Sequence, residues 1–273
     1  MFRIQRSRST FSSAIAMGEL VYHAVVRNIR KSHRNALMSL LTNMLQAVTF
    51  IGVFYVMFSI LGLRGAAIRG DFLIYIMTGI FLFMTHIKTL GAVAGAEGPT
   101  SQMMQHAPMN TLIAILAAAL GTLYVQLLSL FMILFLYHVA VTPVVIDNPI
   151  GAFSMLLLAW FTGLSMGVVF FALKPWFPTF VGIFTSVYQR ANMIASGKMF
   201  VANTLPGFML AMFDWNPLFH CIDQSRGFAF INYFPRHSSV TYPLYFGLAF
   251  LMIGLMLEFF TRKNLSASWS ARG

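Results

Sequence analysis

Residues 111–138 read TLIAILAAALGTLYVQLLSLFMILFLYH and contain no Asp, Glu, Lys or Arg. The hydrocarbon core of a bilayer is about 30 Å thick, and a helix needs about 20 residues to cross it. Because hydrocarbon offers the backbone no hydrogen-bond partners, a single segment that crosses it must bond within itself as a helix. The stretch therefore predicts a membrane-spanning helix.

Further apolar runs of comparable length occur on both sides of this stretch. Each exceeds the ~18 residues that mark a candidate span, so we expect an all-α, polytopic membrane protein with six transmembrane helices. The expected spans are residues 36–62, 72–95, 111–138, 151–173, 177–200 and 241–260.

The overall composition agrees with a membrane protein. Hydrophobic residues make up 58% of the chain and charged residues 9%, whereas a soluble domain has about 25% charged residues. Six spans and their loops occupy most of a 273-residue chain, which leaves no room for a large soluble domain. The single cysteine, Cys221, excludes an internal disulfide.

The first 35 residues differ from the rest in charge. They contain no apolar core followed by a small-residue cleavage site, so we expect that they are not a cleavable signal peptide. Residues 15–34 carry apolar side chains on one helical face and basic side chains on another. Such a helix lies in the headgroup layer; a solvated basic tail is the alternative. We therefore divide the chain into a cytoplasmic arm with an interfacial helix, residues 1–35, and a transmembrane domain, residues 36–273.

The distribution of lysine and arginine predicts the orientation of the chain. Of the 18 Lys and Arg residues, seven lie in the N-terminal arm, one is Lys174 and three lie in the C-terminal tail. The loops on the opposite side hold four. Because cytoplasmic loops carry the excess of these residues, we expect both termini in the cytoplasm.

Residues 203–240, between the fifth and sixth expected spans, have a different pattern. The apolar stretch 205–213 is too short to cross the membrane, and Pro206-Gly207 and Asn216-Pro217 bracket it. Since such pairs are turn signals, we expect a compact element of short re-entrant or interfacial helices on the extracytoplasmic side.

Known motifs for nucleotide binding and catalysis are absent from the sequence. A phosphate-binding loop has the pattern G-x-x-x-x-G-K-[ST], but the Gly197-Lys198 pair has Asn192 in place of the first glycine and Met199 in place of Ser or Thr. There is no H-E-x-x-H or G-x-S-x-G pattern either. We therefore expect no enzyme activity, metal or cofactor on this chain.

Three alternatives stay open at this point. His220, Cys221 and Asp223 lie close in sequence, as metal ligands do, although the same spacing occurs on an ordinary polar helix face. A membrane-embedded enzyme would use His86, His138 or Asp223. A membrane scaffold or assembly subunit without transport activity would need none of the charged residues within the spans.

Polar side chains within the spans are costly to place in lipid, so each indicates a partner helix or a functional site. Ser39, Thr42, Asn43 and Gln46 recur at three- and four-residue spacing and share one helical face of the first span. Such a stripe faces either a partner helix, with which it forms hydrogen bonds, or a water-filled path.

Arg190 lies near the middle of the fifth expected span. An arginine there costs at least about 2.5 kcal/mol in insertion measurements, so we expect it to face a cavity or an anionic partner. The alternative is an arginine that bonds to backbone carbonyls of a neighbouring helix. The candidate substrate path consists of Arg190, Lys198, Tyr188, Asn192, Asn43 and Gln46.

Three stretches together resemble a known family. The first, residues 27–34, leads from the basic arm into the first span, and the second, residues 72–108, ends in His106-Ala107-Pro108. The third is the most specific, with the order S-G, F, L-P, W-N-P-L-x-H and R. Its residues are Ser196, Gly197, Phe200, Leu205, Pro206, Trp215, Asn216, Pro217, Leu218, His220 and Arg226. The chain resembles the membrane subunit of ABC-2 type exporters, most of all the inner-membrane permease for capsular polysaccharide.

The resemblance implies a permease subunit of an ATP-driven exporter in the bacterial inner membrane. Two copies of the chain would surround a conduit for a lipid-linked, often acidic, polysaccharide. Two cytoplasmic ABC ATPase subunits would bind ATP and Mg, and periplasmic and outer-membrane export proteins would act downstream. O-antigen, teichoic acid and small hydrophobic molecules are alternative cargoes of the same superfamily. No nucleic acid partner is implied.

The resemblance also assigns roles to individual residues. The connection 96–110 would be a coupling helix that contacts the ATPase, together with the N-terminal arm; the coupling residues would be Glu97, Gln102, Gln105, His106, Arg27 and Arg30. The short helices at 203–240 would close the outer mouth, and the motif residues at this gate would be Ser196, Gly197, Pro206, Asn216, Pro217, His220 and Arg226.

Overall fold

The computed structural model describes residues 10–32, 36–62, 68, 70–98 and 111–270, and over these residues all regular structure is helical. The described helices are α1 (Thr10–Ser32), α2 (Ala36–Ile60), α3 (Phe72–Ala94), α5 (Thr111–Ala140), α6 (Pro149–Leu173), α7 (Pro178–Ala195), η1 (Ala202–Thr204), α8 (Gly207–Phe213), α9 (Pro217–Ala229) and α10 (Thr241–Ser270). The all-α prediction is confirmed for this part of the chain.

Five of the described helices are long and apolar enough to cross a membrane. They are α2, α3, α5, α6 and α10, and each covers one of the expected spans. The remaining expected span, residues 177–200, corresponds to α7, which is shorter and is not among the five. The reason lies in its second half, where the polar residues Gln189, Arg190 and Asn192 interrupt the apolar sequence.

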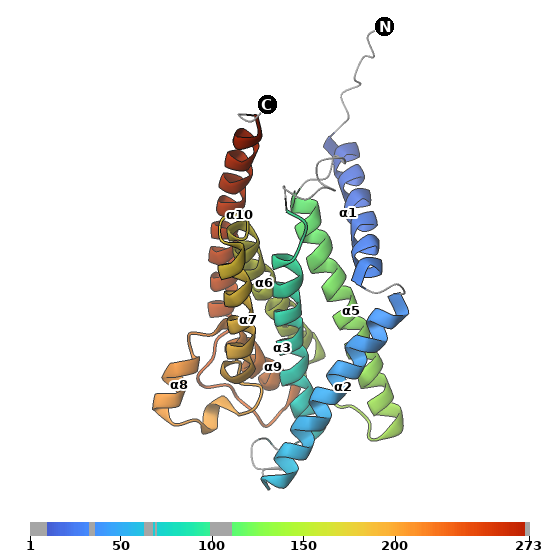
Figure 1. Cartoon of the computed structure of the whole chain (residues 1–273). Coiled ribbons are helices and arrows are strands. Elements are labelled where there is room, and N and C mark those ends of the chain that lie inside the picture. The colour runs from blue at the N-terminus through green and yellow to red at the C-terminus, as the bar shows by residue number, and fades with distance from the viewer. Residues whose placement is uncertain (1–9, 33–35, 63–67, 69, 99–110, 271–273) are drawn as a thin grey trace.

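The spans form a bundle around a central pair, α3 and α6. Figure 1 shows α1 and the end of α10 at one end of the bundle, and α8 and α9 toward the other. In the apolar windows of α3 and α6, 78% and 72% of the residues are buried, against 22–28% for α2, α5 and α10. The outer helices therefore expose apolar side chains where lipid would contact them.

Two glycines allow the central helices to approach closely. Gly163 and Gly167 of α6 lie four residues apart on the face that packs against α3, as in the small-xxx-small pattern of membrane helices. A Cβ atom at Gly163 would lie 2.5 Å from the backbone carbonyl oxygen of His86, and one at Gly167 would lie 2.8 Å from Cβ of Val93. The crossing therefore depends on the absence of side chains at both positions.

Proline or asparagine residues mark the starts of three helices after α5, namely α6, α7 and α9. Pro149, Pro178 and Pro217 each start a helix, in agreement with the preference of proline for the first turn. Asn148 and Asn216 cap α6 and α9 through their side-chain oxygens. The short helices expected at 203–240 are present as α8 and α9.

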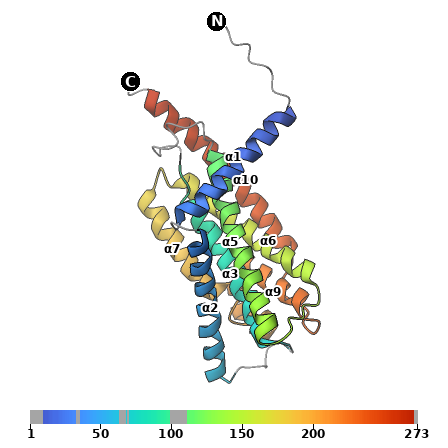
Figure 2. The same ribbon diagram turned by 90° about the vertical axis from the view of Figure 1, so that its right-hand side faces the viewer.

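The arm helix α1 packs on α5. Figure 1 shows it beside the upper part of α5, and Figure 2 shows it inclined across the bundle. Its apolar residues Val25 and Ile29 lie partly buried, whereas Tyr22, His23 and Arg27 are exposed. The predicted amphipathic division is therefore present between Tyr22 and Ile29.

Candidate functional site

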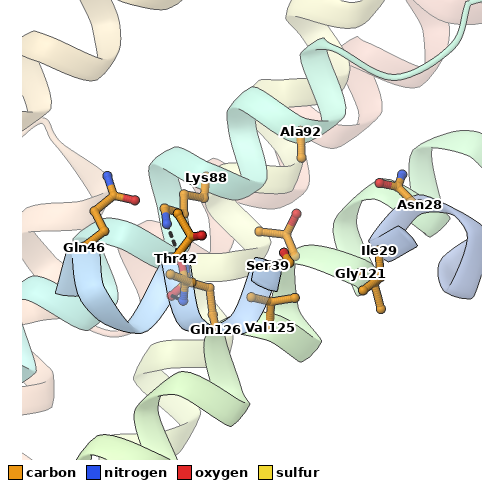
Figure 3. A pocket seen from close by; sticks show the side chains of 12 residues that line it. Asn28, Ile29, Ser39, Thr42, Gln46, Lys88, Ala92, Gly121, Val125 and Gln126 are labelled. Carbon is orange, nitrogen blue, oxygen red and sulfur yellow. Dashed lines mark hydrogen bonds between the residues drawn. The ribbon is translucent and has the colours of Figure 1, made fainter. Parts of the chain in front are cut away.

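A polar pocket of about 330 Å³ lies between α1, α2, α3 and α5. Figure 3 shows side chains from these helices arranged around it, including Thr42 and Gln46 of α2, Lys88 of α3 and Gln126 of α5. Several polar groups and one cation in a membrane-spanning region are expensive to bury. The pocket is therefore a candidate binding site.

Hydrogen bonds fix the inner wall of this pocket. Lys88 Nζ donates to Asn43 Oδ1, and Asn43 Nδ2 donates to Ser129 Oγ at 2.6 Å. Gln126 Nε2 donates to the same Asn43 oxygen at 3.3 Å. One buried asparagine of α2 thus joins α3 and α5, in the way that polar residues connect membrane helices.

The polar stripe predicted on the first span lies along the pocket. Ser39 and Asn43 are buried and Thr42 and Gln46 are exposed, and all four line the pocket. The stripe as a whole therefore borders the pocket, and Asn43 within it also bonds to neighbouring helices. Asn43 forms helix–helix hydrogen bonds, and Gln46 borders a cavity.

Arg190 lies on the outer face of α7. Of the residues of this helix, only Val181 and Asn192 are buried. A groove runs along α7 past Thr179, Gly182, Ser186 and Arg190. The structure gives Arg190 no hydrogen bond or ion pair within the described part of the chain, so the bonding to neighbouring carbonyls considered for it does not occur there.

Tyr188 and Asn192, predicted to lie with Arg190 on one path, point to the interior instead. The Tyr188 hydroxyl lies 3.1 Å from Nε2 of His86, which is fully buried. Asn192 Oδ1 accepts a hydrogen bond of 2.9 Å from Asn216 of α9. Of these three α7 residues, only Arg190 is exposed.

Lys198 is enclosed by aromatic rings. Its side chain is 4% exposed, and Nζ lies 3.4 Å from the ring centroid of Phe83 and 5.5 Å from that of Phe54. The ammonium has no hydrogen-bond partner among the described residues. Cation–π attraction to these rings is therefore its main stabilising contact.

The motif residues between 196 and 226 converge on α9. Arg226 is 1% exposed and donates to three backbone carbonyls: Nη1 to Gly197 at 2.9 Å and Phe200 at 2.6 Å, and Nη2 to Lys198 at 2.9 Å. Its guanidinium also lies over the Tyr75 ring at 4.2 Å. This arginine therefore pairs the backbone carbonyls of the turn that follows α7.

The other motif residues define the same turn. Gly197 has φ of +77°, which favours glycine, and a Cβ there would lie 2.8 Å from the Phe219 ring. Ser196 is fully buried beside it, and Asn216 Nδ2 donates to the carbonyl of Ala195 at 2.9 Å. Pro206 and Pro217 mark the starts of α8 and α9.

His220 connects α9 by hydrogen bonds to the segments before and after it. Its Nε2 lies 2.5 Å from the carbonyl oxygen of Asp214, and Nδ1 accepts from the Ser239 backbone at 3.1 Å. Burial lowers the pKa of His220, against the opposing effects of the Asp214 hydrogen bond and the Asp223 charge. Because Nδ1 is an acceptor here, the ring is neutral, and Nε2 is the donor.

Asp223 also forms hydrogen bonds that connect α9 to the segment after it. It accepts hydrogen bonds from the Tyr233 hydroxyl and from Ser238 Oγ, and burial beside this carboxylate raises the pKa of Tyr233. Cys221 is fully buried in the apolar core. Within the described residues no three His, Cys, Asp or Glu side chains lie close enough together to hold a metal ion.

Two of the predicted coupling residues contact each other. Arg27 Nη2 of α1 lies 3.4 Å from Glu97 Oε2, just after α3. This ion pair joins the arm to the start of the 96–110 connection. Gln102, Gln105 and His106 and the side chain of Arg30 lie outside the described residues.

Lys88, Gln126 and Ser129, which form hydrogen bonds with Asn43, were not predicted as site residues. Gln126 and Ser129 lie three residues apart and are polar positions within the uncharged run 111–138. Their spacing places them on one helical face, and this pattern could have identified them from the sequence.

No family model and no curated protein matches this chain.

Proposed function

We propose that this chain is the membrane-spanning subunit of an ATP-driven exporter of lipid-linked, acidic polysaccharide in the bacterial inner membrane. Two copies form the conduit, and two separate ATPase chains bind ATP and Mg. In this proposal α7 is the sixth span, both termini lie in the cytoplasm, and α8 and α9 are re-entrant helices at the outer mouth.

The observation that carries the proposal is the exposed arginine on α7. Val187 and Ile194, also on the exposed part of α7, are apolar and more than half exposed. In lipid, Arg190 would be costly, whereas a second copy facing α7 would cover the apolar residues and leave the arginine at a water-filled interface. A positive group in that position attracts an anionic polymer.

The arm supports the coupling part of the proposal. The ion pair between Arg27 and Glu97 connects α1 to the connection that follows α3. A push by an ATPase on residues 96–110 would therefore act on α3 and on the arm together. Since α3 is one of the two central helices, such a displacement would reach the core of the bundle.

Deletion of the gene tests the proposal directly. With the glycosyltransferases intact, we expect the cell's acidic polysaccharide to accumulate in the cytoplasm and to return to the surface when the wild-type chain is expressed. Immunogold labelling measures its location. Normal surface polysaccharide in the deletion strain would exclude this cargo and favour a small hydrophobic molecule.

The variant Arg190→Ala is expected to lower export by at least about tenfold, because a charge-assisted contact contributes about 1.5–3 kcal/mol. Surface polysaccharide in the complemented deletion strain measures the loss. Arg190→Lys keeps the charge and should retain most of the export. Arg236→Ala removes an exposed loop arginine and should have no effect. Full export by Arg190→Ala at normal expression would contradict the proposed path.

A charge swap tests the coupling role of the Arg27–Glu97 pair. An exposed ion pair contributes only about 0–1 kcal/mol to stability, so Arg27→Glu or Glu97→Arg alone should leave the amount of folded protein unchanged and lower export. We expect the double variant Arg27→Glu/Glu97→Arg to recover export. If both single variants export normally, this contact has no part in coupling.

A further inference from the structure

An apolar groove adjoins the polar pocket at Ile29. The groove has a volume of about 620 Å³ and lies between α1 and α5, where Val21, Val25 and Leu120 line it. Ile29 borders both cavities. The two cavities therefore meet at Ile29, and together they combine a polar end that contains a cation with an apolar end.

The polar end has the chemistry of an anion site. Lys88 is its charged residue, and its lining contains no aspartate or glutamate. An ammonium has three N–H donors, and the structure pairs Lys88 Nζ with one acceptor among the described residues, Asn43 Oδ1. Thr42 and Gln46 add neutral polar groups at the same wall, as Figure 3 shows.

The depth of the pocket matches the boundary between lipid headgroups and acyl chains. Lys88 precedes the end of α3 at Ala94 by six residues, and Thr42 follows the start of α2 at Ala36 by six residues. At 1.5 Å per residue both lie about 9 Å inside the helix ends. The Lys88 ammonium bonds to Asn43, seven residues inside α2, so a phosphate bound to it would lie just below the headgroup layer.

We propose that this pocket and groove bind one anionic phospholipid of the surrounding bilayer. Its phosphate lies at Lys88, Thr42 and Gln46, and one acyl chain lies along Val21, Val25 and Leu120. The lipid thereby holds α1 against α5. This site is separate from the proposed conduit, because α7 with Arg190 packs on α3 and α6, whereas α1 packs on α5.

The proposal is tested on the full-length protein by native mass spectrometry. The protein is reconstituted in nanodiscs of phosphatidylglycerol or phosphatidylcholine and then released into mild detergent. We expect the wild type to retain one phosphatidylglycerol and to lose phosphatidylcholine. Lys88→Met should lower the retained phosphatidylglycerol about fivefold, since one lysine near an anionic surface contributes about 1 kcal/mol.

Matched variants separate a site from general charge effects. Lys88→Arg keeps the cation and should retain the lipid. Lys263→Met makes the same substitution at an exposed lysine of α10 and should change nothing. Gln46→Lys adds a second ammonium beside the pocket and should increase retention, so the proposal stays testable even if Lys88→Met does not fold.

Equal retention of the two lipids by the wild type would overturn the proposal, and so would unchanged retention in both Lys88→Met and Gln46→Lys. Displacement of phosphatidylglycerol by a glycan-bearing lipid from the same cells would assign the pocket to the transported substrate instead. All of these readouts are made without ATPase or transport, so they are independent of the proposed export function.

Discussion

Replacement of Arg226 by methionine is expected to lower the free energy of unfolding by at least about 3 kcal/mol. The substitution leaves the carbonyl oxygens of Lys198 and Phe200 without their Arg226 donor in a buried turn, and it leaves that of Gly197 with only the 3.4 Å bond from the Phe200 N–H. Each unpaired buried group costs about 1–3 kcal/mol. The contact with the Tyr75 ring is lost as well. Thermal unfolding in detergent, followed by fluorescence-detected size exclusion, measures the effect.

Two further variants identify the cause of that loss. Arg236→Met makes the same change at an exposed loop arginine and should leave the unfolding temperature unchanged. Arg226→Lys keeps the charge but lacks the planar fork that reaches several carbonyls at once, so it should be intermediate. An Arg226→Met protein as stable as the wild type would contradict a structural role for this residue.

Gly163→Ala is expected to destabilise the protein by about 1–3 kcal/mol, the usual range for overpacking. The added methyl group would lie 2.5 Å from the His86 carbonyl oxygen and 3.0 Å from its Cα. Since both are backbone atoms, α3 and α6 must move apart. The hydrogen bond between His86 Nδ1 and Thr162 Oγ1, at 3.0 Å, lies at the same crossing and would be strained.

Gly182→Ala is a matched control for this substitution. It adds the same methyl group to a helix, but no atom outside its own helix turn lies within 4 Å of the added Cβ. Because alanine is favoured over glycine in helices by about 0.5–1 kcal/mol, this variant should be as stable as the wild type or more so. Equal unfolding temperatures for Gly163→Ala and Gly182→Ala would show that the α3–α6 crossing tolerates a wider separation.

The positions of the long helices could be predicted from the sequence because each is a property of a continuous segment. An uncharged run such as 111–138 must form a helix in lipid whatever surrounds it. The structure places α5 at Thr111–Ala140. Prolines at 149, 178 and 217 likewise fix helix starts locally.

The division of roles among polar residues could not be predicted in the same way. Arg190 and Arg226 are both arginines in apolar surroundings, and the carbonyl-bonding role considered for Arg190 belongs to Arg226. The difference depends on which face of each helix meets a neighbour, and periodicity within one segment does not contain that information. For the same reason the sequence could not show that Tyr188 and Asn192 point to the interior.

The sequence by itself determined that this is an all-helical membrane protein, because the length and apolarity of its segments satisfy the requirements of a bilayer one segment at a time. Only the tertiary structure decided that α3 and α6 form the centre and that Lys88, Asn43 and Gln126 meet in one pocket. Those contacts join residues far apart in the chain, and close approach between helices depends on paired surfaces such as Gly163 against His86.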